Sequence, residues 1–342
     1  MKPGLVIDLR SPLIDRTPGS LAPQLTPTEI NDLISNSHTA DEIKYADADF
    51  EFMEELGSGA GGSVAKVFYR PTNTIMARKY LSVIVDNEMD RKNAKRNLKR
   101  ELKILHRCDS EFIVRSFGAY SAEAGVYLVM EYMDLGSLEA VYKTCGPIDQ
   151  HIGAKIAVRT LSGLLYLQKM EIVHRDIKPS NLLLNRLGQV KIADFGVSKE
   201  LINTQARTFT GTQGYLAPER INSGQVYGII SDIWSLGLTL MELVTGKFPY
   251  SGNAIGSSGN PSEQMGLFDL IEYIKAQPAP SLPDGFEKDF VDLVTDCVIK
   301  DHEKRPGPEN LLEYPCCIAA KADGCNLKPW VDSLASKMVD NS

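Results

Sequence analysis

The residues best placed to do chemistry lie in one short segment, His174 to Asn181. Asp176 is a carboxylate that can accept the proton of an attacking hydroxyl group and orient that group. Lys178 can neutralise charge that develops on a transferring phosphoryl group, and Asn181 offers an amide oxygen to a metal ion. This combination and spacing predict a catalytic loop for phosphoryl transfer.

Two further charged residues are expected to complete a nucleotide site. Asp194, in the Asp-Phe-Gly triplet 194–196, offers a carboxylate to a magnesium ion that bridges the β- and γ-phosphates. Lys79 ends a predicted strand, where its ammonium group can hold the α- and β-phosphates as a point charge. A strand lysine alone is also typical of a solvated surface, so Lys79 needs a partner that orients it. Glu101, on a predicted helix over 87–106, is the candidate.

A glycine cluster lies upstream of Lys79. Gly57, Gly59 and Gly62, followed by Val64, fit the spacing G-x-G-x-x-G-x-V, and a backbone without side chains can approach phosphate oxygens and donate N–H groups to them. A glycine-rich hairpin turn would look the same. The spacing also resembles a dinucleotide-binding fingerprint, but a strand follows the cluster here, whereas a helix follows that fingerprint.

Residues further along the chain are expected to hold this machinery in place. Glu219, which ends the triplet 217–219, and Arg305 are predicted to form a structural ion pair. Asp232, at the start of an apolar helix over 229–246, is predicted to brace the catalytic loop. Each short motif could occur by chance, but their order and separations together indicate one phosphotransferase site.

The elements that must position these residues change in type along the chain. Short runs of β-branched and aromatic residues predict strands in the first third, and helical periodicity dominates afterwards. This distribution predicts an α+β fold with two lobes, a small sheet-rich lobe and a larger helical lobe. The predicted strands are 50–53, 64–68, 75–79, 112–120 and 126–132, and the predicted helices are 87–106, 149–170, 229–246, 267–276 and 286–299.

The chain also divides into three parts by composition. Proline-rich residues 1–47 show no sustained apolar period, which predicts a flexible leader with a regulatory or docking role. Residues 48–318 are expected to form the catalytic domain, and residues 319–342 a C-terminal extension. Within the domain, the lobe boundaries are expected at 48–133 and 134–318.

The composition argues against several classes of protein. The 342 residues carry a net charge of −7, which argues against general affinity for nucleic acid or membranes. No apolar run approaches the length of a membrane helix, and Met1 to Arg10 lacks the apolar stretch of a signal peptide. These features predict a cytoplasmic protein, with the nucleus as a second location. Six cysteines without CxxC spacing predict free thiols in a reducing compartment.

With these motifs in place, residues 50–318 resemble the eukaryotic protein kinases. The resemblance implies the bilobal protein kinase fold, with ATP and Mg²⁺ bound between the lobes. It also implies that Met130 is the gatekeeper beside adenine and that the backbone of Glu131 to Met133 is the hinge that contacts it. Lys178 after Asp176 is typical of serine/threonine-type kinases. The implied nucleotide contacts are Leu56, Gly57, Ser58, Gly59, Ala60, Gly61, Gly62, Val64, Ala77, Lys79, Met130, Glu131, Met133, Ser180 and Asp194, with Asn181 and Asp194 on the metal.

The match narrows to the MAP kinase kinases. The similar segments are Asp49-Phe50-Glu51, Met76-Ala77-Arg78-Lys79, Arg100-Glu101-Leu102, Val173 to Asn181 and Asp194 to Ser198. That family implies a dual-specificity enzyme, which phosphorylates threonine and tyrosine in the activation loop of a MAP kinase. It implies an upstream MAP kinase kinase kinase and scaffold proteins as further partners. The activating phosphates would fall on Thr204 and Thr208, where members usually have serine first, and Arg175 would receive the second.

Some features depart from the family or leave alternatives open. Residues 214–217 differ from its usual sequence where kinases contact the substrate's acceptor site. Alternating apolar residues over 5–9 resemble its docking motif with a single basic residue before them, and 26–37 could act as its autoinhibitory helix. Eight basic residues over 91–107 predict either a solvated helix face or a docking surface.

Two other functions compete with this interpretation. One is another serine/threonine kinase of the same broad group that acts further upstream. The other is a pseudokinase scaffold that binds partners and transfers nothing. The second is disfavoured because all four residues that catalysis needs are present: Lys79, Asp176, Asn181 and Asp194.

Overall fold

A computed structural model describes residues 43–59, 62–81, 108–122, 125–194, 214–221, 228–250 and 267–339. Several predictions fall outside these described residues. They are the leader up to residue 42, the helix over 87–106 with Glu101, and the residues Ala60, Gly61, Thr204 and Thr208.

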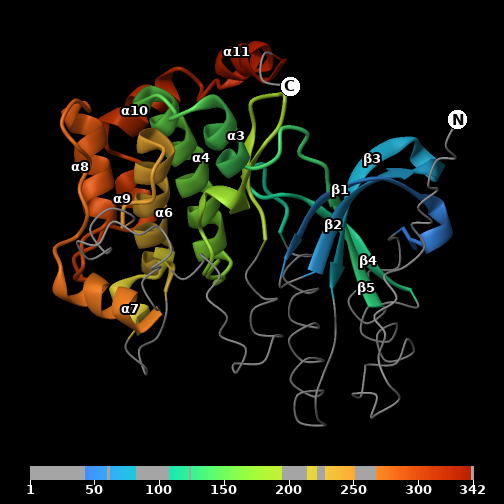
Figure 1. Ribbon diagram of the computed structural model, residues 1–342, viewed down its shortest axis with the longest axis horizontal. Helices are drawn as coiled ribbons and strands as arrows, with labels where there is room; N and C mark the ends of the chain where they lie inside the picture. The colour runs from blue at the N-terminus through green and yellow to red at the C-terminus, as the bar shows by residue number, and fades with distance from the viewer. Residues whose placement is uncertain are drawn as a thin grey trace, which may run out of the picture.

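The first part of the described chain forms a five-stranded antiparallel sheet (Figure 1). Its strands, in the spatial order β1-β2-β3-β5-β4, are β1 (Phe50–Gly59), β2 (Gly62–Tyr69), β3 (Thr74–Leu81), β5 (Gly125–Glu131) and β4 (Ser116–Ala122). Aromatic side chains pack on one face of it, where the rings of Phe50 and Tyr120 stack with centroids 5.5 Å apart. Burial of this aromatic cluster stabilises the sheet.

The second part is mainly helical and holds the larger apolar core. Its helices are α3 (Leu138–Cys145), α4 (Gln150–Lys169), α6 (Ile229–Thr245), α7 (Leu267–Ala276), α8 (Lys288–Cys297), α9 (Pro308–Leu311), α10 (Pro315–Ala322) and α11 (Lys328–Val339), and a small sheet pairs β6 (Leu182–Leu184) with β7 (Val190–Ile192). Helix α6 is apolar on nearly every side and is buried almost throughout, as expected for a helix at the centre of a large core. Helix α4 packs against α6 and α10.

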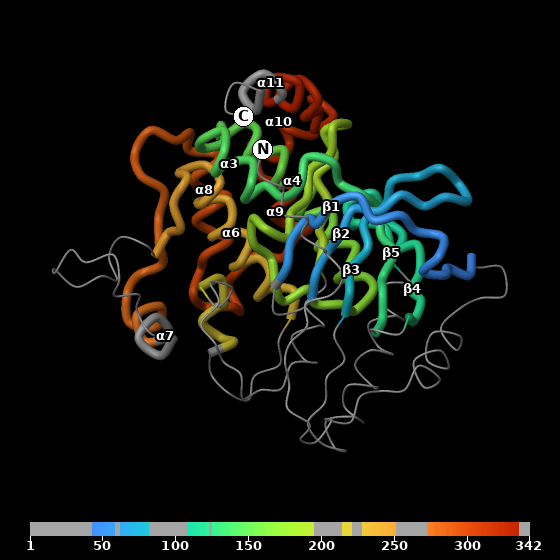
Figure 2. Tube along the Cα trace, turned by 45° about the vertical axis from the view of Figure 1, so that its right-hand side comes forward, coloured from blue at the N-terminus to red at the C-terminus, as the bar shows by residue number. Residues whose placement is uncertain are grey.

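The sheet and the helices lie side by side as two lobes (Figure 1), and the tube in Figure 2 shows the same separation from another direction. This arrangement confirms the predicted α+β fold with a sheet-rich lobe followed by a helical lobe. The helices predicted over 149–170, 229–246, 267–276 and 286–299 correspond to α4, α6, α7 and α8.

Two predicted strands differ clearly from the structure. Strand β1 extends to Gly59, beyond the predicted 50–53. The prediction covered 112–120, but β4 begins at Ser116. The residues just before it bond to β7 of the helical lobe instead: the Ile192 N–H donates to the Phe112 carbonyl (2.9 Å), and the Val114 N–H donates to the Ile192 carbonyl (2.9 Å). The apolar pattern continues upstream of Ser116 because Ile113 and Val114 are buried, but these residues lie against β7 and outside the five-stranded sheet.

Candidate active site

The register of the sheet brings the predicted nucleotide contacts together. Gly57 on β1 lies opposite Val64 on β2, and Val64 lies opposite Lys79 on β3. On the other side of β3, Ala77 lies opposite Met130 of β5. Residues separated by up to 73 positions in sequence therefore share one region of the sheet.

Two glycines of the cluster have different environments. Gly62 has a φ of 123°, and a Cβ atom there would lie 1.8 Å from the carbonyl oxygen of Tyr80, so the approach of β2 to β3 requires glycine. A Cβ on Gly57 would meet nothing within 4 Å. Packing does not demand glycine at Gly57, and the open space beside it fits a phosphate group that approaches the backbone.

Lys79 and Asp194 form an ion pair between the two lobes. Lys79 is 5% exposed, whereas the Asp194 side chain is 49% exposed. Asp194 has a φ of 59°, a left-handed conformation that is uncommon for residues other than glycine. The sequence named Glu101 as the partner of Lys79. Glu101 lies outside the described residues, and the partner that the structure does place there is Asp194.

Three predicted catalytic residues meet at one carboxylate. The side-chain amide of Asn181 donates to the carbonyl oxygen of Asp176 (2.7 Å) and to its Oδ2 (2.8 Å). The Nζ of Lys178 lies 3.3 Å from the same Oδ2. Because the Asn181 nitrogen is used in this way, its amide oxygen points elsewhere and accepts no hydrogen bond from any described residue. That oxygen is suited to a hard cation such as Mg²⁺.

Asp232 braces the catalytic loop, as the sequence predicted. Its carboxylate accepts the backbone N–H groups of His174 (2.8 Å) and Arg175 (2.7 Å). Burial raises the pKa of the Asp232 carboxyl, and the nearby His174 and these two hydrogen bonds oppose the shift. The His174 side chain extends the brace, because its Nε2 donates to the carbonyl of Ala193, next to Asp194 (3.0 Å).

The predicted ion pair of Glu219 and Arg305 is also confirmed. The guanidinium donates Nη1 to Oε1 (2.7 Å) and Nη2 to Oε2 (3.1 Å) of Glu219. Burial alone would raise the pKa of Glu219, but the hydrogen bonds and charge of Arg305 outweigh it and hold that pKa below its usual range. The pair anchors the segment that follows Gly214 to the helical lobe.

The hinge contains a contact that the sequence prediction missed. Lys191 of β7 donates its Nζ to both carboxylate oxygens of Glu131, at 2.7 and 2.8 Å. The side chain of Glu131 is therefore held by Lys191, and the predicted role in nucleotide binding rests on the hinge backbone. Met133 is buried, and no described residue accepts its N–H. The one signal in the sequence was a lysine flanked by apolar residues, Val190 and Ile192.

Comparison with known proteins assigns the family. Residues 50–317 match the protein kinase domain. The chain is 46% identical over 294 residues to MST7 of Pyricularia oryzae, a mitogen-activated protein kinase kinase, covering 84% of this chain and 69% of the relative. It is 38% identical to the dual specificity protein kinase FUZ7 of Mycosarcoma maydis and 39% identical to dSOR1 of Drosophila melanogaster, a dual specificity mitogen-activated protein kinase kinase. Each of these matches covers 84% of this chain and 75% of the relative.

The chain belongs to the MAP kinase kinase family of protein kinases. This confirms the resemblance inferred from the motifs, and it makes the chain an ATP-dependent protein kinase. The roles of individual site residues stay predictions. Among them, Ser180 lies half-buried between Lys178 and Asn181, and Leu56 is exposed on β1 beside Gly57.

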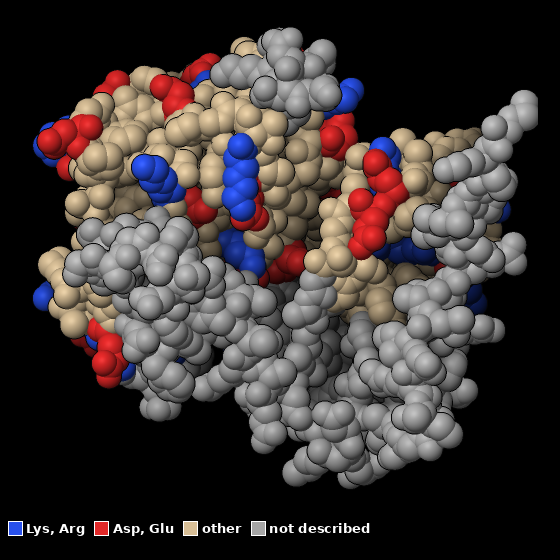
Figure 3. All heavy atoms as spheres, in the orientation of Figure 1, with Lys and Arg blue, Asp and Glu red and all other residues tan. Residues whose placement is uncertain are grey.

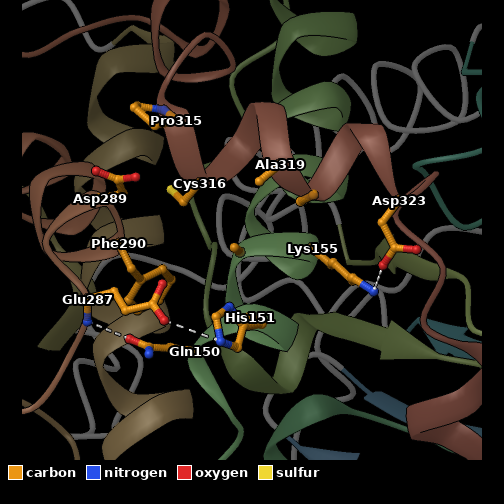
Figure 4. Close-up of a pocket in the computed structure, with 12 residues that line it drawn as sticks. Gln150, His151, Lys155, Glu287, Asp289, Phe290, Pro315, Cys316, Ala319 and Asp323 are labelled. Atoms are coloured by element: carbon orange, nitrogen blue, oxygen red, sulfur yellow. Dashed lines mark hydrogen bonds and ion pairs between the residues drawn. The ribbon is translucent and has the colours of Figure 1, made fainter.

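The kinase also has a hollow away from this site. It has a volume of about 270 Å³ and lies between α4, α8 and α10 (Figure 4). Two pairs of its polar side chains interact: Lys155 with Asp323, and the Nε2 of His151 with Oε1 of Glu287 at 3.4 Å. None of the predicted site residues lines it. The hollow is therefore separate from the candidate active site.

The surface of the kinase carries both signs of charge. In the view of Figure 3, acidic and basic side chains are interspersed over the described part of that face. Among the described residues, no helix is both long and apolar enough to span a membrane.

Proposed function

We propose that this chain is a dual-specificity MAP kinase kinase, which transfers the γ-phosphate of ATP to threonine and tyrosine in the activation loop of a MAP kinase. The observation that supports transfer best is the meeting of Lys178 and Asn181 at Asp176, in the lobe that also carries Asp194. The choice of substrate is supported by the relatives, two of which are named as dual-specificity kinases.

Asp176 is the residue proposed to receive the acceptor's proton. Its carboxylate is nearly buried and is oriented by the Asn181 amide at 2.8 Å, so it can align a substrate hydroxyl for attack. Lys178 lies at 3.3 Å and can place its charge beside the transferring phosphoryl group. The two residues therefore have different proposed roles: Asp176 orients the nucleophile, and Lys178 stabilises charge.

The remaining charged groups fit a nucleotide and its metal. Lys79 is proposed to hold the α- and β-phosphates. Asp194 and the amide oxygen of Asn181 offer two oxygen ligands to Mg²⁺, which usually binds a few protein oxygens together with substrate phosphates. Bound Mg²⁺ would neutralise charge on the β- and γ-phosphates. The buried hinge residue Met133 offers its N–H to adenine.

Phosphorylation by an upstream MAP kinase kinase kinase is proposed to switch the enzyme on at Thr204 and Thr208. Each phosphate would add close to two negative charges, and Arg175 is the proposed cation for the one on Thr208. Arg175 has a φ of 72° and its backbone is fixed by Asp232, so its position is set before any phosphate arrives.

The test is transfer to defined substrates. Thr204→Glu with Thr208→Glu mimics the activated form, and it is incubated with Mg-ATP and a panel of kinase-dead MAP kinases. We expect phosphate on both threonine and tyrosine of at least one panel member, located by mass spectrometry. An Asp176→Asn version of the same protein is the matched control. Transfer to serine or threonine of other kinases alone would favour an upstream kinase, and no transfer at all would favour a pseudokinase.

A further inference from the structure

Lys191 is a buried cation outside the predicted set of catalytic residues. It lies in the middle of β7 between two core residues, and its side chain is 10% exposed. An ammonium group is strongly hydrated, so its burial is costly unless a carboxylate and good hydrogen bonds compensate it. Lys191 has both, because its Nζ contacts the two oxygens of Glu131 at 2.7 and 2.8 Å.

Glu131 is held from a second side. Its backbone N–H donates to the carbonyl of Arg115 (2.9 Å), and the Arg115 N–H donates to its Oε2 (3.2 Å). The carboxylate therefore joins the end of β5, the residue just before β4, and β7 of the helical lobe. A carboxylate that accepts three hydrogen bonds from two donor groups has little freedom to move.

The two ends of this ion pair lead to two different parts of the nucleotide site. Glu131 is two residues before Met133, whose N–H is proposed to meet adenine. Lys191 is three residues before Asp194, which is proposed to hold the metal. The segment between Lys191 and Asp194 is also held in place, because the Ala193 N–H donates to the carbonyl of Asn181 (2.8 Å).

We propose that Lys191 is a positioning residue for the nucleotide. Its ion pair with Glu131 sets the hinge backbone relative to β7, which ends two residues before Asp194, and so fixes the separation between the adenine and phosphate subsites. The inference rests on the proposed function, because it takes the hinge to be the adenine subsite. A buried ion pair is weak support for stability alone, since apolar residues of similar size often replace one without loss.

The chain offers a matched control in Lys155. It pairs with Asp323 and is also largely buried, at 15% exposed, but it lies on α4 beside the hollow of Figure 4. Lys155→Met and Lys191→Met each remove a largely buried ammonium group from an ion pair, although the Asp323 side chain is 59% exposed and the Glu131 side chain 23%. The two variants differ in whether the pair touches the hinge.

The first measurement needs no nucleotide. Hydrogen–deuterium exchange of the hinge amides, residues 131–133, is followed in the free protein. We expect faster exchange in Lys191→Met than in the wild type, because the hinge loses its tie to β7, and wild-type exchange in Lys155→Met. Equal hinge exchange in the wild type and Lys191→Met would overturn the proposal.

The second measurement is binding of adenosine and of Mg-ATP by calorimetry. In Lys191→Met we expect both affinities to fall by roughly 3- to 30-fold, as for other residues that act on a site through an intermediate. In steady-state kinetics the loss should fall on KM for ATP and leave KM for the protein substrate unchanged. A lower melting temperature with wild-type adenosine affinity would mean that the pair is only structural.

A double-mutant cycle separates the pair from its members. Because Glu131→Gln and Lys191→Met break the same contact, the double variant should lose no more adenosine affinity than the worse single variant. Lys191→Arg keeps the cation and guards against misfolding of the methionine variant, and it should retain most of the affinity. Additive losses, or an arginine variant as weak as the methionine variant, would contradict the inference. Failure of the wild type to bind adenosine or ATP would instead refute the proposed function.

Discussion

Two ion pairs of this kinase lie in different regions, and they differ in burial and in the number of hydrogen bonds that they make. In the helical lobe, Arg305 is fully buried, and besides Glu219 it donates to the carbonyls of Ile299 (2.8 Å) and Ile230 (2.9 Å). Glu219 also accepts the Ser231 hydroxyl (2.9 Å). Between the lobes, Lys79 meets an Asp194 side chain that is 49% exposed. A buried pair with this many hydrogen bonds serves the fold, whereas a half-exposed carboxylate keeps capacity for a ligand.

The largest loss of stability should come from breaking the buried pair of Arg305 and Glu219. Arg305→Met leaves the Glu219 carboxylate buried without a cation, so the free energy of unfolding should fall by about 3–5 kcal/mol. Urea unfolding measures it. Lys304→Met is the control, because the neighbouring Lys304 is 78% exposed and its loss should barely move the midpoint. An Arg305→Met protein as stable as the wild type would contradict the structural role of the pair with Glu219.

The other pair should show the opposite result. Lys79→Met is expected to lower kcat by roughly 10²–10³-fold, the usual loss for one group that stabilises charge in the transition state. Its thermal unfolding should stay close to the wild type, since the partly exposed Asp194 remains hydrated. Phosphate transfer is assayed at saturating ATP. Retained activity would refute the catalytic role of Lys79.

The buried carboxylate of Glu242 extends the comparison to a group that is bonded by hydroxyls. Glu242 is buried, and it accepts the hydroxyls of Tyr142 (2.6 Å) and Tyr215, with no cation from the described residues bonded to it. Tyr142→Phe removes one of these donors and should cost about 1–3 kcal/mol of unfolding free energy. Tyr250→Phe is the matched control, because the buried Tyr250 hydroxyl has no partner among the described residues. Equal losses in the two variants would show that the hydrogen bond to Glu242 contributes little.

The smallest expected effect is the pH dependence of the stability that Glu219 contributes through its pair with Arg305. Because the folded pKa of Glu219 lies below its unfolded value of 4.5, this group stabilises the fold above that pH, and the stabilisation disappears as the pH falls through the folded pKa. The difference in unfolding free energy between the wild type and Glu219→Gln should therefore shrink between about pH 6 and about pH 3. A difference that stays constant over this range would contradict the lowered pKa.

The sequence predicted those parts of the site whose chemistry is written in short motifs. Asp176 to Asn181 are only five positions apart in sequence, so their spacing alone implies that Lys178 and Asn181 lie near the carboxylate. Helices α4, α6, α7 and α8 were predicted from their apolar periods. Helices α3, α9 and α10 and the three-residue strands β6 and β7 were missed because eight residues or fewer give too short a pattern, and α11 was not predicted either.

Contacts between distant residues were harder to predict. Lys191 and Glu131 are 60 residues apart, and the apolar neighbours of Lys191, Val190 and Ile192, fit a lysine on an exposed strand as well as a buried one. The pair of Glu219 and Arg305 was found only because both belong to motifs of the resembled family. Long-range pairs without a motif depend on how the lobes meet, which a local pattern does not encode.

The hydrogen bonds between Phe112, Val114 and Ile192 bear on how this protein can be dissected. The predicted boundary between the lobes lies near residue 133, yet a segment that precedes it completes the edge of β7. A fragment that begins at residue 134 would expose that strand edge, which is a template for pairing with other chains and for aggregation. The two lobes should therefore unfold as one cooperative unit, and recombinant expression of the helical lobe alone should yield insoluble material.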